Sequence, residues 1–496
     1  MQKIYKYLMF IPALFLFTQC NEVLEQDVYS SIEMDVLYDS QTAAEVGITG
    51  CYNRFFNEAA YSQLILYFQV STDDVKQPSG WAFQLKDRTQ LTPNPSSGGG
   101  FNTPWARMYT AVANINLFLE KVAEIPDDKF SGNRKAELLA EGHFLRGISY
   151  YYLSMQWGDV PLILELKTGG PEDNDVPKTP RAQVMEQVKA DLAIAARDLP
   201  DVLTNYSDDP ETNMRKGRAS KWAAKAYLAR IALMEDNMDD ALALSNEIIN
   251  SGLYPLATKW RSIFEEPMNS SESIFEQQND YSPGFFGSGL FGWFMGHVFQ
   301  ISDELYTVFD TADELKVTQG KDIRWEFMYG KHPWSSNIAI RKHVPPRGYN
   351  LGGIEQLNFV LIRATELYFN KHEIQIEQNY EANKQAALDF LNMIRARTKD
   401  MEWVNPWWPV PDGAVGIPLL TMADVDTKEK MIQAIRDEKR REMVYEDGMR
   451  WFDLLRWDKE YAKQITNSAT DDHLFLPYPE DEVLRNQELV QNPAYQ

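Results

Sequence analysis

The chain has 496 residues, of which 44% are hydrophobic, so it can bury a sizeable core in one large domain or a few small ones. Its 49 lysines and arginines against 72 aspartates and glutamates give a formal charge of -23. This charge repels polyphosphate and disfavours adsorption to anionic lipid, so no nucleic acid is expected among the partners.

Residues 1–19 are predicted to be a lipoprotein signal peptide. Lys3 and Lys6 are positive, residues 8–17 are mostly apolar, and Cys20 follows. The apolar run is too short to cross a bilayer. We expect cleavage before Cys20 and diacylation of its thiol, which leaves residues 20–36 as a lipidated tether.

Cys51 is the only other cysteine in the chain. Once Cys20 carries lipid, no intramolecular disulfide is possible, and stability must come from the core. Cys51 lies in a predicted helix over residues 47–56, where a buried, inert thiol is a better interpretation than a nucleophile.

Hydrophobic spacing predicts paired helices along most of the chain. Apolar residues recur every three or four positions over residues 138–155, and this helix is expected to stop at Gly158. Two helices over residues 222–233 and 241–248 share a face of small residues, in a unit about as long as a tetratricopeptide repeat. A third pair is predicted with Leu361, Ala364 and Tyr368 on one helix and Ala387, Leu391 and Ile394 on the next.

These pairs predict a mostly α fold, a degenerate tetratricopeptide-repeat superhelix of about four helical hairpins, including residues 135–199 and a C-terminal pair. Long stretches interrupt it. Residues 76–102 are rich in Pro, Ser and Gly, and residues 281–296 interleave glycine with aromatic residues. Loops of this length in a compact domain are usually functional or mobile. Residues 273–277 and 337–341 alternate as short strands would.

The C-terminal segment, residues 435–457, combines an apolar stripe with many charges. Glu438, Arg441, Glu442 and Glu446 are spaced for pairs along a helix that Gly448 is expected to stop. A second short helix follows, in which Arg450, Asp453 and Arg456 are left to cap and pair. We interpret these charges as structural, because paired charges at helix ends usually fix packing geometry.

This segment, with residues 474–480 and 491–495, resembles the C-terminal signature of the SusD/RagB family of surface lipoproteins. Residues 146–162, 217–227, 362–368 and 391–397 resemble further blocks of the family in the same order. The resemblance implies one SusD-like domain over residues 37–496. Its repeat helices are expected mainly in 104–252 and 357–460, and an irregular ligand-binding subdomain in 61–103 and 255–356.

The resemblance also implies a location and a partner. Glu22, Glu25 and Asp27 are similar to the acidic tract that directs lipoproteins to the outer face of the outer membrane in Bacteroidetes-type bacteria. The protein is therefore expected to be lipid-anchored at the cell surface, where it would hold cargo above a SusC-like TonB-dependent transporter.

A sugar-binding site needs flat aromatic faces on which pyranose rings stack, with polar groups for the hydroxyls. In the family, ligand is held by the loop near a serine-aspartate motif and by the irregular middle of the chain. The expected ligand-binding residues are Asp73, Asp74, Trp81, Phe83, Tyr281, Phe285, Phe286, Trp293 and Trp334. The alternative is that these aromatics only pack the irregular subdomain. Trp105 is assigned to the core, whereas Trp403, Trp407 and Trp408 in the insertion 401–418 stay unassigned.

No catalytic site is predicted. The 6 histidines form no metal-ligand spacing, and neither a nucleophile elbow nor a phosphate loop is present. No cofactor is expected. Calcium is a minor alternative, in which the oxygens of Asp208, Asp209, Glu211 and Asn213, or those of Asp173, Asn174 and Asp175, would bind the ion; solvated turns explain these residues better.

The sequence thus predicts a cell-surface protein that captures oligosaccharides and delivers them to the transporter. Two alternatives stay open. One keeps the architecture and binds peptides, as in the RagB branch. The other is a protein-interaction scaffold with no small ligand.

Overall fold

The computed structural model describes residues 38–56, 61, 63–76, 86–92, 102–166, 175–202, 216–264, 269–278, 301–309, 322, 324, 329–331, 338–340, 342, 358–398 and 417–496. The helices are α2 (Gln41–Phe55), α3 (Gln63–Val70), α5 (Asn102–Glu124), α6 (Arg134–Trp157), α7 (Arg181–Asp198), α8 (Lys221–Met234), α9 (Met238–Asn250), α11 (Asp303–Val308), α13 (Ala364–Gln378), α14 (Tyr380–Ala396), α15 (Lys428–Met443), α16 (Met449–Trp457), α17 (Lys459–Ile465) and α18 (Glu480–Arg485). The strands are β1 (Val160–Pro161), β2 (Lys178–Thr179), β3 (Ser273–Gln277), β4 (Tyr329–Lys331), β5 (Ile338–Ile340) and β6 (Phe359–Arg363).

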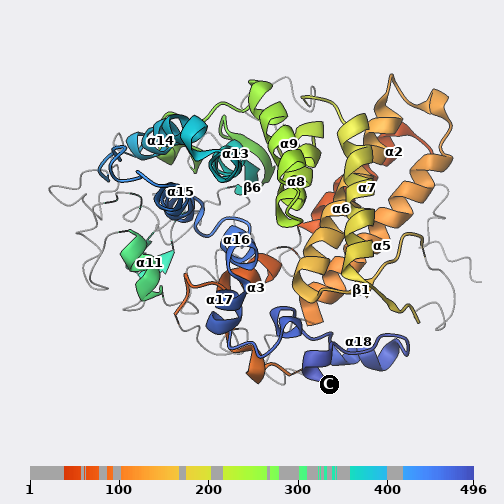
Figure 1. The fold of residues 1–496 in the computed structure, drawn as a ribbon. Helices are drawn as coiled ribbons and strands as arrows, with labels where there is room; N and C mark the ends of the chain where they lie inside the picture. Colours follow the sequence, from red (N-terminus) through yellow and green to blue (C-terminus); the bar gives the residue numbers. More distant parts are fainter. Residues whose placement is uncertain are drawn as a thin grey trace, which may run out of the picture.

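The long helices stack as successive neighbours into a layered array (Figure 1). From one end it runs α2, α5, α6, α7, α8, α9 and α13, and α14 and α15 both pack on α13. The pairs α6/α7, α8/α9, α13/α14 and α15/α16 correspond to the four predicted hairpins. The mostly helical, repeat-like fold is therefore confirmed.

The ends of these helices follow from their capping residues. The hydroxyl of Ser220 accepts from Ala223 N at 3.3 Å and starts α8, and the side chain of Asn237 accepts from the backbone at the start of α9. Gly158 ends α6 with a φ of 76°, as predicted. A Cβ at this position would lie 3.2 Å from the ring of Phe475. Only glycine satisfies both conditions without strain.

The predicted strands at 273–277 and 337–341 are present as β3 and β5. β3 pairs with β6 antiparallel, with Phe275 opposite Ile362, and every residue of both strands is buried. The assignment of Leu361 to a helix is therefore wrong, since it lies in β6 and the helix begins at Ala364. A run that is buried on both faces shows no strand period to distinguish it from helix.

Helix α3 was not expected, because residues 61–103 were assigned to the irregular subdomain. Residues 64–70 of this helix are all buried, and it contacts α6 and α16. Helix α3 is therefore part of the core, and its last residue leads directly into the turn that carries Asp73 and Asp74.

Helix α15 ends before Gly448, the residue at which the sequence predicts that it stops. Helix α15 ends at Met443, and Gly448 is instead the residue that precedes α16, with a φ of 70°. Tyr445 and Asp447 also have positive φ. The helix ends early because the chain turns to bring the carboxylates of Glu446 and Asp447 inward, where both are buried.

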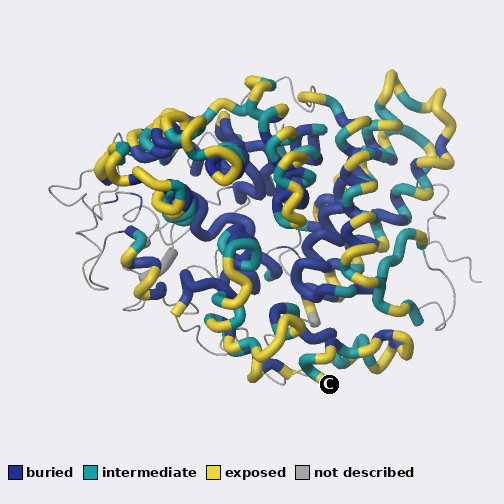
Figure 2. Tube along the Cα trace, in the orientation of Figure 1, coloured by how far each residue is buried: buried dark blue, intermediate teal, exposed yellow. Residues whose placement is uncertain are grey.

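Buried residues are concentrated along α6 and in the centre of the molecule around α16 (Figure 2). The C-terminal residues complete this core, because Leu476 N donates to Gln156 O at 2.9 Å and Trp157 Nε1 donates to Pro477 O at 3.1 Å. In the part of the chain that the structure describes, no helix has both the length and the apolar character needed to span a bilayer.

Candidate functional site

The turn after α3 carries the first two residues predicted to bind ligand, and both are buried. Asp73 is 6% exposed and Asp74 is fully buried. Arg450 of α16 donates to both carboxylate oxygens of Asp73 at 2.8 Å, and Arg440 of α15 donates to Asp74 at 2.8 Å. These contacts fasten the turn to the C-terminal signature.

The electrostatics of Asp73 reflect this pairing. Burial opposes its ionisation, but the hydrogen bonds of Arg450 and the charges of Arg440 and Arg450 outweigh burial and lower its pKa to about 2. Asp73 is thus an anion at neutral pH, and Arg450 donates to both of its oxygens. A direct contact between Asp73 or Asp74 and ligand stays a prediction.

The same turn joins the irregular middle of the chain. Val75 forms an antiparallel bridge with Ile301, and Ser302 N donates to Asp74 O at 3.0 Å. The hydroxyl of Ser302 donates to Asp73 O and accepts from Leu305 N, so it also caps α11. The turn near the serine-aspartate motif and residues 301–303, which belong to the two stretches expected to share the ligand, therefore lie side by side.

The aromatic residues expected to contact ligand lie outside the described residues. They are Trp81, Phe83, Tyr281, Phe285, Phe286, Trp293 and Trp334. The insertion with Trp403, Trp407 and Trp408, the lipidation residue Cys20 and most of the acidic residues considered for calcium also lie outside them. Asp175 is described, and its carboxylate accepts from Gln487 N at 2.8 Å. Among the residues that the structure describes, no group of three or more His, Cys, Asp or Glu side chains could hold a metal ion.

The glutamates of the C-terminal signature form a buried ion-pair network with cations from other segments of the chain. Glu438 and Glu442 both accept from Arg324, at 2.7 and 2.9 Å. Glu442 also accepts from Arg397 at 2.6 Å, and Glu446 accepts from Arg363 at 2.8 Å. The predicted structural role of these charges is confirmed.

The partners of these glutamates were not predicted from the sequence. Arg324, Lys342, Arg363 and Arg397 come from segments far from α15 in the chain. Arg363 and Arg397 lie in the blocks 362–368 and 391–397, which resemble the family. Their place in these blocks is the sequence feature that could have indicated them as partners. The network joins the repeat helices to residues 322, 324 and 342, which belong to the stretch predicted to form an irregular subdomain.

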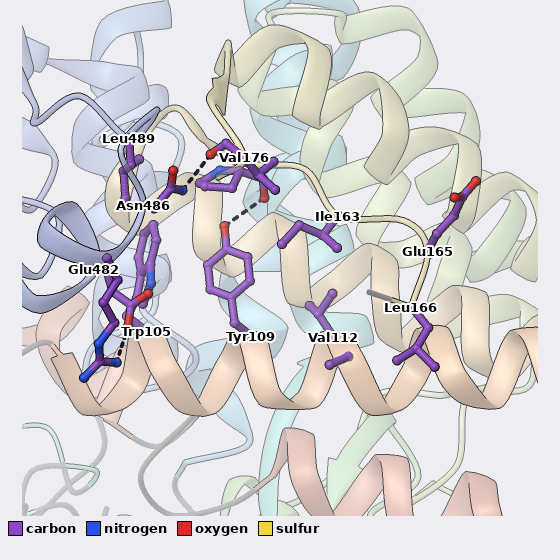
Figure 3. Close-up of a pocket in the computed structure, with 13 residues that line it drawn as sticks. Trp105, Tyr109, Val112, Ile163, Glu165, Leu166, Val176, Glu482, Asn486 and Leu489 are labelled. Atoms are coloured by element: carbon purple, nitrogen blue, oxygen red, sulfur yellow. Dashed lines mark hydrogen bonds and ion pairs between the residues drawn. The ribbon is translucent and has the colours of Figure 1, made fainter. Parts of the chain in front are cut away.

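A pocket of about 640 Å³ lies between α5, the segment after β1 and α18 (Figure 3). Apolar residues that line it include Val112, Ile163, Leu166, Val176 and Leu489, and its polar lining residues are Glu165, Glu482, Arg485 and Asn486. Tyr109 donates to Pro161 O at 2.8 Å. The pocket forms between segments distant in sequence, so no local pattern predicts it.

Trp105 forms one end of this pocket and yet belongs to the core, as predicted. Its side chain is 2% exposed, and its ring packs on Trp157 and Tyr478 with centroid separations of 5.1 and 5.7 Å. Trp105 thus presents little free ring surface to a sugar, and Tyr109 is the only other aromatic residue among the described residues that line the pocket. The pocket lacks the open aromatic platform that pyranose stacking requires.

Comparison with known proteins identifies the family. Residues 23–233 match the family model described as starch-binding associating with outer membrane, and residues 316–473 match the model of the SusD family, SusD/RagB. The chain belongs to the SusD/RagB family.

Relatives of this SusD/RagB protein span almost its whole length. A SusD-like protein of Formosa agariphila is 23% identical over 99% of both chains, and a SusD-like protein of Bacteroides ovatus is 22% identical over 99% of this chain and 98% of its own. A solved SusD-like carbohydrate-binding protein of Bacteroides fragilis superposes with a TM-score of 0.70 at 19% identity, covering 92% of this chain and 100% of the other. A solved laminarin-binding SusD-like protein gives a TM-score of 0.67 at 19% identity with the same coverage. These structures share the fold.

Proposed function

We propose that this SusD/RagB protein is a cell-surface lipoprotein that captures oligosaccharides and delivers them to a SusC-like TonB-dependent transporter in the outer membrane. Lipid on Cys20 anchors it to the outer face of that membrane. The protein binds its cargo without altering it.

The observation that carries the proposal is the junction of residues 73–76 with residues 301–303. The helical array and the buried ion pairs of α15 and α16 fix the base of this junction, and the predicted aromatic stretches adjoin both of its segments in the chain. A rigid base that carries loops is the arrangement in which binding sites are usually found. Membership of a family described as starch-binding, with a laminarin-binding protein among its solved structures, favours a glycan as the cargo.

Delivery to a transporter also limits how tightly the protein can bind its ligand. A ligand held too long would never reach the transporter, so dissociation must keep pace with import. Ring stacking with few charged contacts gives modest affinity and fast release. We therefore expect micromolar rather than nanomolar dissociation constants.

The test is affinity electrophoresis of the mature protein in gels that contain neutral polysaccharides or peptide mixtures. Retardation by a glycan that is relieved in Trp81→Ala or Trp293→Ala supports the proposal. Tyr380→Ala is the matched control, because it removes a half-buried ring from α14, far from the junction. Retardation by peptides alone would contradict the proposal and support the alternative that the protein binds peptides.

The partner and the anchor are tested separately. Purification of the lipidated protein from outer membranes is expected to bring with it a large TonB-dependent barrel, and Cys20→Ser is expected to release the protein from the membrane. If no ligand slows migration but other proteins co-purify, the scaffold alternative replaces the proposal.

A further inference from the structure

Arg88 is a buried cation that pairs with no carboxylate among the residues that the structure describes. It lies in the 3-10 helix Arg88–Gln90 and is 1% exposed. Its Nη2 donates to the hydroxyl of Ser71 at 2.6 Å, but its Nε and Nη1 have no acceptor. An isolated guanidinium loses its hydration on burial and regains only part of it through one neutral hydroxyl.

The other buried arginines of the described residues set the contrast. Each of them forms at least one ion pair; they are Arg146, Arg230, Arg324, Arg363, Arg395 and Arg397. The other buried arginines of the described residues are therefore all paired with carboxylates, and Arg88 is the exception among them. Such an orphan group in a native structure points to a partner that binds from outside.

Lys86 adds a second cation to the same short segment. Its ammonium donates to Thr72 O, next to the Ser71 hydroxyl that Arg88 uses, and no carboxylate of the described residues lies within ion-pair distance of it. Burial lowers the pKa of Lys86 to about 8 despite the nearby carboxylates of Asp73 and Asp74. Lys86 is partly exposed, so an anion that enters from solvent meets it before Arg88.

The carboxylates in this neighbourhood are already occupied. Asp73 and Asp74 are held by Arg450 and Arg440. Asp87, which stands between the two cations in sequence, accepts from Thr89 and Asn467 instead. Glu304 acts on Lys86 electrostatically but forms no ion pair with it, so among the described residues the two cations at Ser71 and Thr72 have no carboxylate of their own.

We propose that Lys86 and Arg88 form a subsite for one carboxylate or sulfate group of an acidic glycan. The identity of the ligand as a glycan rests on the proposed function, and the anionic group is the addition. The segment follows Trp81 and Phe83 by only a few residues, so ring stacking and anion pairing can act on one oligosaccharide. Because the rest of the protein repels a dense polyanion, the expected ligand carries sparse acidic groups.

The test compares a neutral oligosaccharide with a matched one that carries uronate or sulfate, by calorimetric titration of the mature protein at low salt. The acidic ligand is expected to bind more tightly, and Arg88→Met and Lys86→Met are each expected to weaken it about tenfold, the loss of one charge-assisted hydrogen bond. Neither change is expected to affect the neutral ligand. Lys384→Met on α14 is the control, since this cation pairs with Glu381 at the surface.

Two further readouts separate the possible failures. Sodium sulfate stabilises folded proteins in general, so the readout is the difference: at equal ionic strength it is expected to raise the melting temperature of the wild-type protein more than that of Arg88→Met. Arg88→Met without ligand is expected to melt no lower than wild type, because it removes an unpaired buried charge. A loss of several degrees in Arg88→Met would make Arg88 a structural residue and overturn the subsite. Glycan binding that is equal for both ligands and in all variants overturns the subsite but leaves the proposed function intact. Failure of every glycan overturns the proposed function.

Discussion

Neutralising one carboxylate of the buried network tests whether the signature holds the two parts of the molecule together. Glu442 is fully buried and forms ion pairs with Arg324, Arg363 and Arg397 at 2.9, 3.0 and 2.6 Å. Burial opposes its ionisation, but the three guanidinium groups outweigh burial and hold the pKa of Glu442 well below its usual range. Glu442→Gln keeps the shape of the side chain and removes the one carboxylate of the described residues that pairs with all three arginines.

The expected loss of stability follows from this geometry. Breaking a buried ion pair by removing one partner costs about 3–5 kcal/mol, since the other charge stays buried. Unfolding entropy of about 2.1 cal/mol/K per residue gives roughly 1 kcal/mol/K for a folded domain of about 460 residues. Glu442→Gln is therefore expected to lower the melting temperature by about 3–5 °C.

Differential scanning calorimetry of the mature protein measures this shift. Glu381→Gln is the matched control, because Glu381 pairs with Lys384 at the surface of α14 and its side chain is 75% exposed. The control is expected to change stability by less than about 0.5 kcal/mol. Equal melting temperatures for the two variants would refute the claim that the network stabilises the fold.

Three other predictions concern single positions. Gly448→Ala places a residue with a side chain at a backbone φ of 70° and puts its Cβ 2.8 Å from Phe68 Cβ. The midpoint of urea unfolding is therefore expected to fall by the equivalent of about 2–4 kcal/mol. An unchanged midpoint contradicts the close packing of this turn on α3. The pKa of Asp73 is lowered to about 2, so its contribution of about 2 kcal/mol to the free energy of unfolding is complete above pH 4 and is lost as the pH falls from 4 to 2. In Asp73→Asn the free energy of unfolding is expected to depend less on pH over that range. A pH dependence equal to that of wild type speaks against this role. Burial raises the pKa of the Cys51 thiol to about 12, so iodoacetamide at pH 8 is expected to modify Cys51 only in denaturant, as followed by intact mass.

Features with a local cause could be predicted from the sequence. The helices at 138–155 and 222–248 follow from apolar spacing and from capping residues such as Ser220 and Gly158. The structural role of the charges at 438–446 could be predicted from their density beside an apolar stripe, but helical spacing gives only the Glu438–Arg441 pair. Elements without a period could not be recognised in this way, as α3 and β6 show, because complete burial removes the alternation that identifies them.

The site was less accessible to prediction because its chemistry depends on pairing between distant segments. Asp73 and Asp74 stand out as acidic residues after a helix, but nothing nearby in sequence indicates that Arg450 and Arg440 occupy them. Arg88 is an ordinary arginine in the sequence. Its lack of a carboxylate becomes visible only when every neighbouring acid has been assigned to another partner.

The contacts of the C-terminal tail with α6 have a consequence for how the chain is made. Trp157 and Gly158 receive their final neighbours from residues 475–477, and Pro477 is synthesised 320 residues after Trp157. Early hairpins can form during synthesis, but their packing stays incomplete until translation ends, and contacts this distant in sequence slow the closing step. A product truncated before residue 475 is expected to be digested readily by proteases.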